Sequence, residues 1–423
     1  MKNNQINILI FPCGSEVSLE INESLKNNKL INIYGGNSVD DHGKFAFTNY
    51  HGNFPFITDK KFIQYTSDFV KKNKIQYIFP CMDFVLDFMK KNEKKIGCKI
   101  LTSCKETTSL CLSKERTYEH FKNIIRTPIK FKSEKQIKKF PVYLKPKIGY
   151  GSRNNYKVNT IKELKNLYTE DHLILEYLSG DEFTVDCFTD KFKKLLFVNS
   201  RKRVRTLNGI CTNSILYKDE KIEEIANKIN ASIDLNGAWF FQLKKNSNHE
   251  YCLLEIAPRI AGSSAISRYI GVNLAELSIL NELHDNLKVD TNDFLIETDR
   301  SLNTKSKLNL IYKYVYVDLD DTIVVNKKIN INLIRFLYQC INKKIKIILI
   351  TKHKGNVNKT LRKYKLQNIF DNIIHIKSLD DKYKYIKNKK SIFIDDSFME
   401  RYKIKKHLNI PTFSVDSFDC LID

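Results

Sequence analysis

The chain has 423 residues, of which 42% are hydrophobic, so it can bury two or three cores of ordinary size. Its formal net charge is +23, but the lysines are spread along the chain and are not interleaved with aromatic residues in one patch, which argues against nucleic-acid binding. Three explanations of the charge stay open: a coding bias toward Lys, Asn and Ile, a polyanion- or membrane-surface-binding role, and attraction of acidic small substrates.

Apolar runs and cysteine spacing indicate the compartment. No run approaches the roughly eighteen apolar residues that a membrane span needs, and the N-terminal apolar run is too short for a signal peptide. The ten cysteines are scattered, without a C-x-x-C pair or a histidine at metal-binding spacing. We therefore expect a soluble, cytoplasmic, multidomain protein with reduced thiols and no membrane span.

The first 110 residues alternate short apolar runs with amphipathic stretches. The runs at 6–12, 29–35, 75–80 and 98–102 are typical of strands, and stretches such as DFVLDFMKKN are typical of helices. This alternation predicts a Rossmann-like α/β domain over 1–110, a small parallel sheet with helices on both faces. The turn PCGSE after the first strand has only one glycine, so we expect no dinucleotide site there.

Beyond residue 110 the pattern changes. SKERTYEHFKNI is typical of an amphipathic helix with Ser113 as its N-cap. Residues 141–158 then predict two strands joined by a loop that contains Gly149, Gly151 and Ser152. The backbone amides of such a loop can close over phosphate groups, although an ordinary hairpin turn has a similar composition.

Two hairpins follow. The segment 173–190 predicts a strand, a tight turn and a second strand, and a later hairpin would bring Gln242 close to Glu255. The stretch CLLEIAPRIAG places Glu255, Ala257 and Arg259 at alternate positions, on one face if the stretch is a strand. A carboxylate beside a guanidinium is typical of a metal and phosphate site, but a salt-bridged strand has the same pattern.

The succession SKERTYEHF, YLKPKIGYGSR, LEYLSGDEFTVD, RKRVRTLNGIC, WFFQL and LLEIAPRIAG resembles the ATP-grasp superfamily, in its carboxylate–amine ligase form, over roughly residues 1–290. The resemblance implies an ATP-grasp domain over 111–295 that uses ATP and Mg²⁺. ATP phosphorylates a carboxylate in such enzymes, and an amine then attacks the acyl phosphate. The residues that the resemblance assigns to the nucleotide are Lys114, Lys145, Gly149, Gly151, Ser152, Arg153, Glu176, Tyr177, Leu178 and Glu182. Those that it assigns to the metal and the acyl phosphate are Gln242, Glu255 and Arg259.

One position departs from the family pattern. The usual motif is E-x-N-P-R, and Ala257 stands where the asparagine would supply an oxygen to magnesium. Because Mg²⁺ keeps several waters in protein sites, a water could fill that position. We therefore expect a working site with altered metal coordination, and a catalytically inactive fold is the alternative.

A second motif set follows a polar stretch at 296–309, which lacks periodicity and is interpreted as a linker. The run YKYVYVDLDDT is typical of a buried strand and ends in Asp318, Asp320 and Asp321, which repel one another unless a cation is near. Two later apolar runs also end in polar residues, at Thr351, Asp395 and Asp396.

DLDDT, LIT and FIDDS in this order resemble the haloacid dehalogenase (HAD) superfamily of phosphotransferases, over about residues 310–423. The resemblance implies a HAD-like Rossmannoid domain with Asp318 as nucleophile and Asp320 as general acid and base. Thr351 and Lys382 would bind the phosphoryl oxygens. The predicted magnesium ligands are Asp318, Asp320, Asp395 and Asp396. An inactive scaffold domain is the alternative.

The spacing of these motifs leaves no room for a cap domain, since only about 30 residues separate Thr322 from Thr351 and Thr351 from Lys382. We therefore interpret the chain as an α/β and α+β multidomain enzyme, an ATP-dependent carboxylate–amine ligase fused to a capless magnesium-dependent phosphatase. Its partners would be a small-molecule carboxylate and an amine, one of them phosphorylated, as in surface polysaccharide or nucleotide-sugar modification. A non-catalytic HAD-like interaction domain, a polyanion-binding protein and a homodimer stay open.

Overall fold

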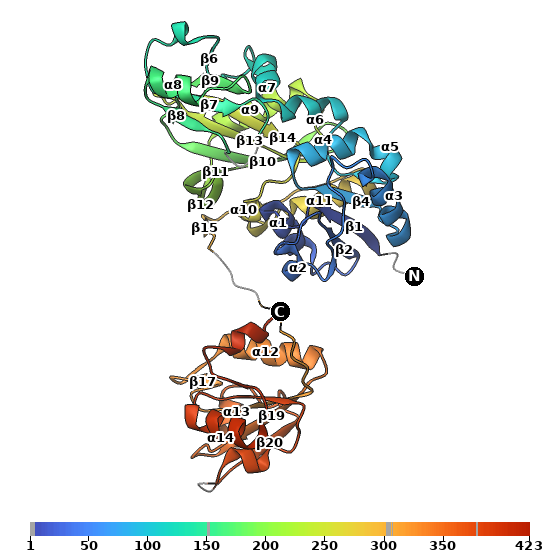
Figure 1. Cartoon of the computed structure of the whole chain (residues 1–423), viewed down its shortest axis with the longest axis vertical. Helices are drawn as coiled ribbons and strands as arrows, with labels where there is room; N and C mark the ends of the chain where they lie inside the picture. Colours follow the sequence, from blue (N-terminus) through green and yellow to red (C-terminus); the bar gives the residue numbers. More distant parts are fainter. Residues whose placement is uncertain (1–4, 150–152, 302–305, 307, 378–379) are drawn as a thin grey trace. The chain divides into compact units, whose positions relative to one another are not determined.

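The computed structural model describes residues 5–149, 153–301, 306, 308–377 and 380–423. The chain forms two compact units, Met1–Leu302 and Asn303–Asp423 (Figure 1). Among the described residues, no helix has the length and apolar character that crossing a membrane requires.

The first unit begins with a five-stranded parallel sheet, as predicted, in the order β3-β2-β1-β4-β5 (Figure 1, blue). The sequence did not predict β3, whose three residues Asn-Tyr-His form no apolar run. The strands are β1 (Ile6–Phe11), β2 (Ile31–Gly36), β3 (Asn49–His51), β4 (Tyr77–Pro80) and β5 (Lys99–Ile100).

Alternate residues of β1 face two different cores. Ile8 and Ile10 pack into the first core, and Leu9 and Phe11 pack into the second. The helices that contribute to the first core are α1 (Glu16–Leu25) and α11 (Leu274–Leu283). Those that contribute to the second are α3 (Phe62–Asn73), α4 (Asp83–Lys91) and α5 (Glu93–Ile96). Because α11 comes from the far end of the unit, the first core joins the two predicted domains of this unit.

A six-stranded antiparallel sheet forms the middle of the unit, in the order β14-β13-β10-β11-β12-β15. Its strands are β10 (Glu182–Thr189), β11 (Leu195–Leu207), β12 (Ile210–Tyr217), β13 (Gly237–Lys245), β14 (Tyr251–Ala257) and β15 (Glu297–Asp299). Phe183 and Val185 of β10 pack against α9 (Glu220–Ser232) in a buried core. The alternate side chains, including Glu182 and Thr184, therefore lie on the opposite face.

A smaller antiparallel sheet stands beside it, in the order β6-β9-β7-β8 (Figure 1). It consists of β6 (Lys130–Phe131), β7 (Val142–Pro146), β8 (Tyr156–Val158) and β9 (His172–Glu176), and α8 (Ile161–Leu167) packs on it. The predicted helix is α7 (Lys114–Phe121), whose N-cap Ser113 accepts a hydrogen bond from the backbone of Arg116. The prediction of this cap is confirmed.

The predicted linker begins too early. Residues 297–299 form β15, which pairs antiparallel with β12. Asn213 of β12 donates hydrogen bonds to the carboxylates of Glu297 and Asp299. These polar side-chain contacts, made at a sheet edge, replace the apolar alternation by which a strand is recognised in sequence.

The second unit has a five-stranded parallel sheet in the order β20-β19-β16-β21-β22 (Figure 1, orange to red). The strands are β16 (Tyr314–Val317), β19 (Lys346–Thr351), β20 (Asn372–His375), β21 (Ser391–Ile394) and β22 (Thr412–Phe413). The helices are α12 (Ile331–Asn342), α13 (Val357–Lys363) and α14 (Phe398–Leu408). Between Thr322 and Thr351 the described chain forms, besides α12 and β19, only a short hairpin of β17 (Val324–Val325) and β18 (Lys328–Ile329).

Candidate functional sites

A pocket in the first unit is lined by residues of both antiparallel sheets. Its empty space is about 890 Å³ including the open mouth, which is within the usual range for small-molecule sites. The predicted residues that line it are Lys114, Lys145, Gly149, Arg153, Glu176, Tyr177, Leu178, Glu182, Gln242 and Glu255. Gly151 and Ser152 lie outside the described residues, and Arg259 is not part of the lining.

Two buried ammonium groups lie in this pocket. Lys145 of β7 donates a hydrogen bond to the Leu254 carbonyl oxygen at 3.3 Å, and Lys114 of α7 donates to the Gly149 carbonyl oxygen at 3.0 Å. Burial lowers the pKa of Lys145 to about 8, with the positive charge of Lys114 acting in the same direction and Glu255 opposing it. Among the residues that the structure describes, both cations donate only to backbone oxygens, which suits them to a polyphosphate ligand.

The pocket lining also contains the carboxylates of Glu182 and Glu255 and the side-chain amide of Gln242. Glu182 forms ion pairs with Arg203 at 2.9 Å and Lys244 at 3.4 Å. Gln242 and Glu255 are direct cross-strand partners of β13 and β14, as the sequence predicted. Among the described residues, the Glu255 carboxylate has no hydrogen-bond partner. An amide oxygen next to a free carboxylate fits the oxygen ligands that Mg²⁺ prefers.

The segment Glu176–Leu178 lines the same pocket at the end of β9. The Glu176 carboxylate accepts a hydrogen bond from the backbone N–H of Ile129 at 2.9 Å and forms an ion pair with Arg126 at 3.4 Å. The Glu176 side chain is therefore held by the protein itself. A ligand in the pocket could contact the neighbouring backbone of Tyr177 and Leu178 instead.

Arg259 differs most from its prediction. The strand β14 ends at Ala257, so Arg259 follows Pro258 beyond the strand and does not extend its alternation. Its guanidinium forms two hydrogen bonds with Asp83, at 2.7 and 2.9 Å, and lies 5.1 Å from the ring centre of Phe240. Burial alone would raise the pKa of Asp83, but the charge and hydrogen bonds of Arg259 hold it below its usual value.

Ala257 occupies an apolar position. It is 4% exposed and packs with Phe240 and Ala261 in a small cluster. The side chain of Ala257 packs against the aromatic ring of Phe240, and neither side chain offers an oxygen to a metal. Asp83 was missed by sequence reasoning, because its partner lies 176 positions away in the chain.

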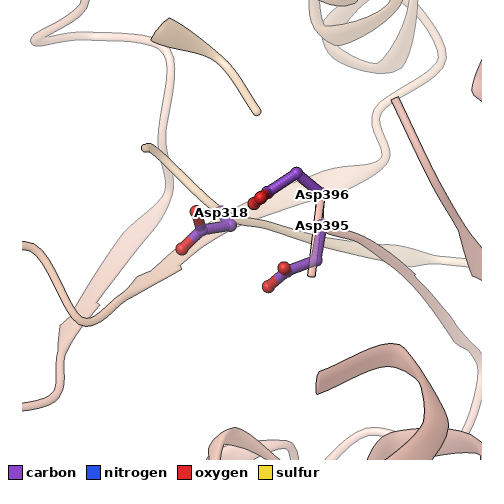
Figure 2. Close-up of side chains that lie close together, drawn as sticks. All are labelled: Asp318, Asp395 and Asp396. Carbon is purple, nitrogen blue, oxygen red and sulfur yellow. The ribbon is translucent and has the colours of Figure 1, made fainter. Parts of the chain in front are cut away.

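In the second unit, three carboxylates lie together at the carboxyl ends of adjacent strands. Asp318 follows β16, and Asp395 and Asp396 follow β21, its neighbour in the sheet. Figure 2 shows the three side chains close together, and one oxygen from each lies within 4.8 Å of the others. Such a group of hard oxygen donors fits Mg²⁺.

Lys382 connects two of these carboxylates. Its Nζ donates to Asp318 Oδ1 at 2.5 Å and to Asp395 Oδ2 at 2.6 Å, and all three side chains are buried. Burial raises the pKa of both carboxyl groups, and the attraction of Lys382 offsets this only in part. One ammonium thus leaves the acidic group short of positive charge, a deficit that a divalent cation would fill.

The Asp320 carboxylate lies apart from this cluster. It contacts the ring of His353 and is not one of the three grouped carboxylates, although the sequence placed it among the metal ligands. Thr351 is fully buried, and its hydroxyl oxygen accepts a hydrogen bond from the His353 backbone at 3.2 Å. Thr322 and His353 are contacts that sequence reasoning missed; Thr322 accepts from the Asp396 backbone at 2.9 Å.

Part of the chain matches the model of a known protein family. The family model described as "ATP-grasp in the biosynthetic pathway with Ter operon" matches residues 168–302. No curated protein matches the chain.

Solved structures are similar to the chain at low identity. The biotin carboxylase domain of 2-oxoglutarate carboxylase from Hydrogenobacter thermophilus, in complex with MgADP and bicarbonate, has a TM-score of 0.57 at 17% identity, covering 67% of this chain and 71% of its own. N5-carboxyaminoimidazole synthetase from Staphylococcus aureus, complexed with ADP, has a TM-score of 0.55 at 17% identity, with 68% and 79% covered. An L-amino acid ligase from Bacillus licheniformis has a TM-score of 0.52 at 18% identity, with 67% and 75% covered. The family-model match lies within the first unit, and the chain therefore contains an ATP-grasp fold.

Proposed function

We propose that residues 1–302 form an ATP-dependent carboxylate–amine ligase. The observation that carries the proposal is that two buried lysines line the same pocket as Glu255 and Gln242. Three similar solved proteins with the same fold include two that were solved with ADP and one ligase of amino acids. The lining residues supply positive charge for the phosphate groups and a negative charge for the magnesium ion.

In this proposal the chain acts mainly by positioning and by charge. Lys114 and Lys145 bind phosphate oxygens, and Gln242 and Glu255 hold Mg²⁺, which supplies charge neutralisation when bound. Transfer of the γ-phosphate to a substrate carboxylate breaks the β–γ phosphoanhydride bond and forms an acyl phosphate. Attack by an amine then releases phosphate and leaves an amide.

A screen for ADP release tests the ligase. Carboxylates are paired with amines in the presence of ATP and Mg²⁺, and Glu255→Ala serves as the inactive control. Amine-dependent and Glu255-dependent ADP formation would support the proposal. Binding to polyanions that falls steeply with salt, without any such activity, would favour the polyanion-binding alternative.

We propose further that residues 303–423 form a HAD-like, magnesium-dependent phosphatase. The observation that carries this is Lys382 bridging Asp318 and Asp395 beside Asp396. Asp318 would attack the phosphorus atom, Lys382 and Thr351 would bind phosphoryl oxygens, and Asp320 would protonate the leaving group and later deprotonate water.

Trapping of the phosphoenzyme tests this second activity. Wild-type protein should form an acid-labile phosphoaspartate with p-nitrophenyl phosphate and Mg²⁺, and Asp318→Asn should not. Hydrolysis by Asp318→Asn near the wild-type rate would assign the chemistry elsewhere or show a non-catalytic domain. The fusion further suggests that a ligase substrate or product is a phosphate monoester, as in surface polysaccharide or nucleotide-sugar modification in the cytoplasm.

A further inference from the structure

The segment directly after β19 holds a histidine that the proposed reactions do not use. His353 Nδ1 lies 2.9 Å from both carboxylate oxygens of Asp320, and Nε2 lies 2.9 Å from the hydroxyl oxygen of Thr360 on α13. The backbone of His353 is also held, because its N–H donates to Thr351 and its carbonyl oxygen accepts from His375 Nε2 at 2.8 Å. The imidazole is thus held at both ring nitrogens and through its main chain.

The hydrogen-bond partners determine the tautomer of a neutral ring. An ionised carboxylate only accepts hydrogen bonds, so Nδ1 carries the hydrogen that is donated to Asp320. Nε2 is then an acceptor, and the Thr360 hydroxyl supplies the donor. Thr360 therefore orients His353, and His353 orients Asp320.

Exposure explains why Asp320 needs such a support. The Asp320 side chain is 51% exposed, whereas that of His353 is 18% exposed. A carboxylate in solvent has several rotamers of similar energy, and only some of them direct an oxygen at the substrate. A ring fixed by packing and by two hydrogen bonds selects among those rotamers.

The neighbouring glycine is consistent with a site built around the ring. A Cβ added at Gly355 would lie 3.0 Å from His353 Nε2, a contact tight enough that the ring would have to give by a few tenths of an ångström. The backbone at this position therefore leaves room for the imidazole and for its contact with Thr360.

We propose that His353 is a positioning residue for Asp320 in phosphate ester hydrolysis; this inference rests on the proposed phosphatase function. As Asp318 forms its bond to phosphorus, the bond from phosphorus to the leaving oxygen breaks, and the Asp320 carboxyl group gives its proton to that oxygen. The Asp320 carboxylate then takes a proton from the water that attacks the phosphoaspartate and releases phosphate. His353 gains and loses no proton in these steps and acts only on the orientation of Asp320.

Leaving-group dependence tests the proposal in the full-length protein. The value of kcat/KM reports the steps up to formation of the phosphoenzyme, where an alkoxide needs a proton and p-nitrophenolate needs little help. We expect His353→Ala to lower kcat/KM for an alkyl phosphate about 10- to 100-fold and that for p-nitrophenyl phosphate by less than about 3-fold. Thr360→Val should also lower kcat/KM more for the alkyl phosphate than for p-nitrophenyl phosphate, but by smaller factors than His353→Ala.

Two amide variants distinguish positioning from packing. The side-chain amide of His353→Asn reaches the place of Nδ1 and should restore most of the alkyl phosphate activity, whereas His353→Gln reaches the place of Nε2 and should not. Equal losses for both esters, or an asparagine variant as impaired as the alanine variant, would overturn the proposal; thermal unfolding of each variant identifies losses that come from misfolding. Absence of Asp318-dependent hydrolysis in the wild type would instead refute the phosphatase function itself, and this inference with it.

Discussion

The Arg259 guanidinium is held by the Asp83 carboxylate through two hydrogen bonds, Nε at 2.7 Å and the NH2 group at 2.9 Å. Asp83 is the first residue of α4, beside the parallel sheet, and Arg259 follows the last residues of β14. The pair therefore connects the parallel sheet to the antiparallel sheet that carries Glu255. It orients the arginine that the ATP-grasp resemblance assigns to the acyl phosphate.

Asp83→Asn should impair the ligase. The neutral amide cannot balance the guanidinium, so Arg259 loses its fixed orientation, and we expect kcat for ADP formation to fall about 10-fold or more. The free energy of unfolding should fall by about 1–3 kcal/mol, which is less than for a fully buried ion pair, because the side chains of this pair are partly exposed. Asp68→Asn, on the exposed face of α3, is the matched control and should change neither value. An unchanged kcat for Asp83→Asn would show that the pair has no part in catalysis.

Ala257→Asn tests whether position 257 can supply a metal ligand. The side chain faces Phe240 and Ala261, so the amide would be buried among apolar atoms, and we expect a loss of about 1–3 kcal/mol in unfolding free energy. The magnesium concentration that gives half-maximal ADP formation should not decrease. A clear decrease would mean that the new amide reaches the metal and that a water fills the position in the natural protein.

Nucleotide affinity should depend on the charge of Lys145. Since burial lowers the pKa of Lys145 to about 8, the group is protonated below that pH and neutral above it in the free protein. We expect the Kd of a nonhydrolysable ATP analogue to rise as the pH increases through about 8, and Lys145→Arg, which stays charged, to flatten this dependence. Titration calorimetry between about pH 6.5 and 9.5 measures it, and an equally steep profile for Lys145→Arg would assign the effect to another group.

The same shift has a consequence for stability. Because the folded state of Lys145 binds its proton more weakly than the unfolded state, the unfolding free energy of the ligand-free protein should rise between about pH 8 and the usual lysine value of 10.5. Lys145→Met should remove this part of the rise, which denaturant titrations at several pH values can detect.

A fragment of residues 303–423 tests why the two units are joined. This unit has its own buried cores, and a cut at 302/303 leaves β15 in its sheet. We expect the fragment to hydrolyse p-nitrophenyl phosphate like the full chain, but to lose preference for the phosphorylated ligase product, because an uncapped site encloses little of its substrate. The measurement is the ratio of kcat/KM for that product to kcat/KM for the generic ester. Equal ratios in fragment and full chain would show that the ligase unit adds no recognition.

Local patterns in the sequence were sufficient for most strands and for the pairing of Gln242 with Glu255. Apolar runs such as 6–12 and the run before Asp318 predict buried parallel strands, because such strands are covered on both faces. The resemblance to the HAD superfamily implied that Asp318 and Asp395 lie together, and the adjacent parallel strands β16 and β21 bring their carboxyl ends to one edge of the sheet. The ATP-grasp fold, too, could be predicted from the order of its motifs.

Tertiary structure alone decided the contacts that depend on distant partners. Asp83 and Arg259 lie 176 positions apart, and Asp320 and His353 lie 33 apart, so no local periodicity relates either pair. The strand at 297–299 is polar, and only its pairing with β12 makes it a strand. Hydrogen bonds between side chains follow from how the elements pack, whereas apolar periodicity is a property of each element alone, and for this reason the sequence predicted the strands but not these pairs.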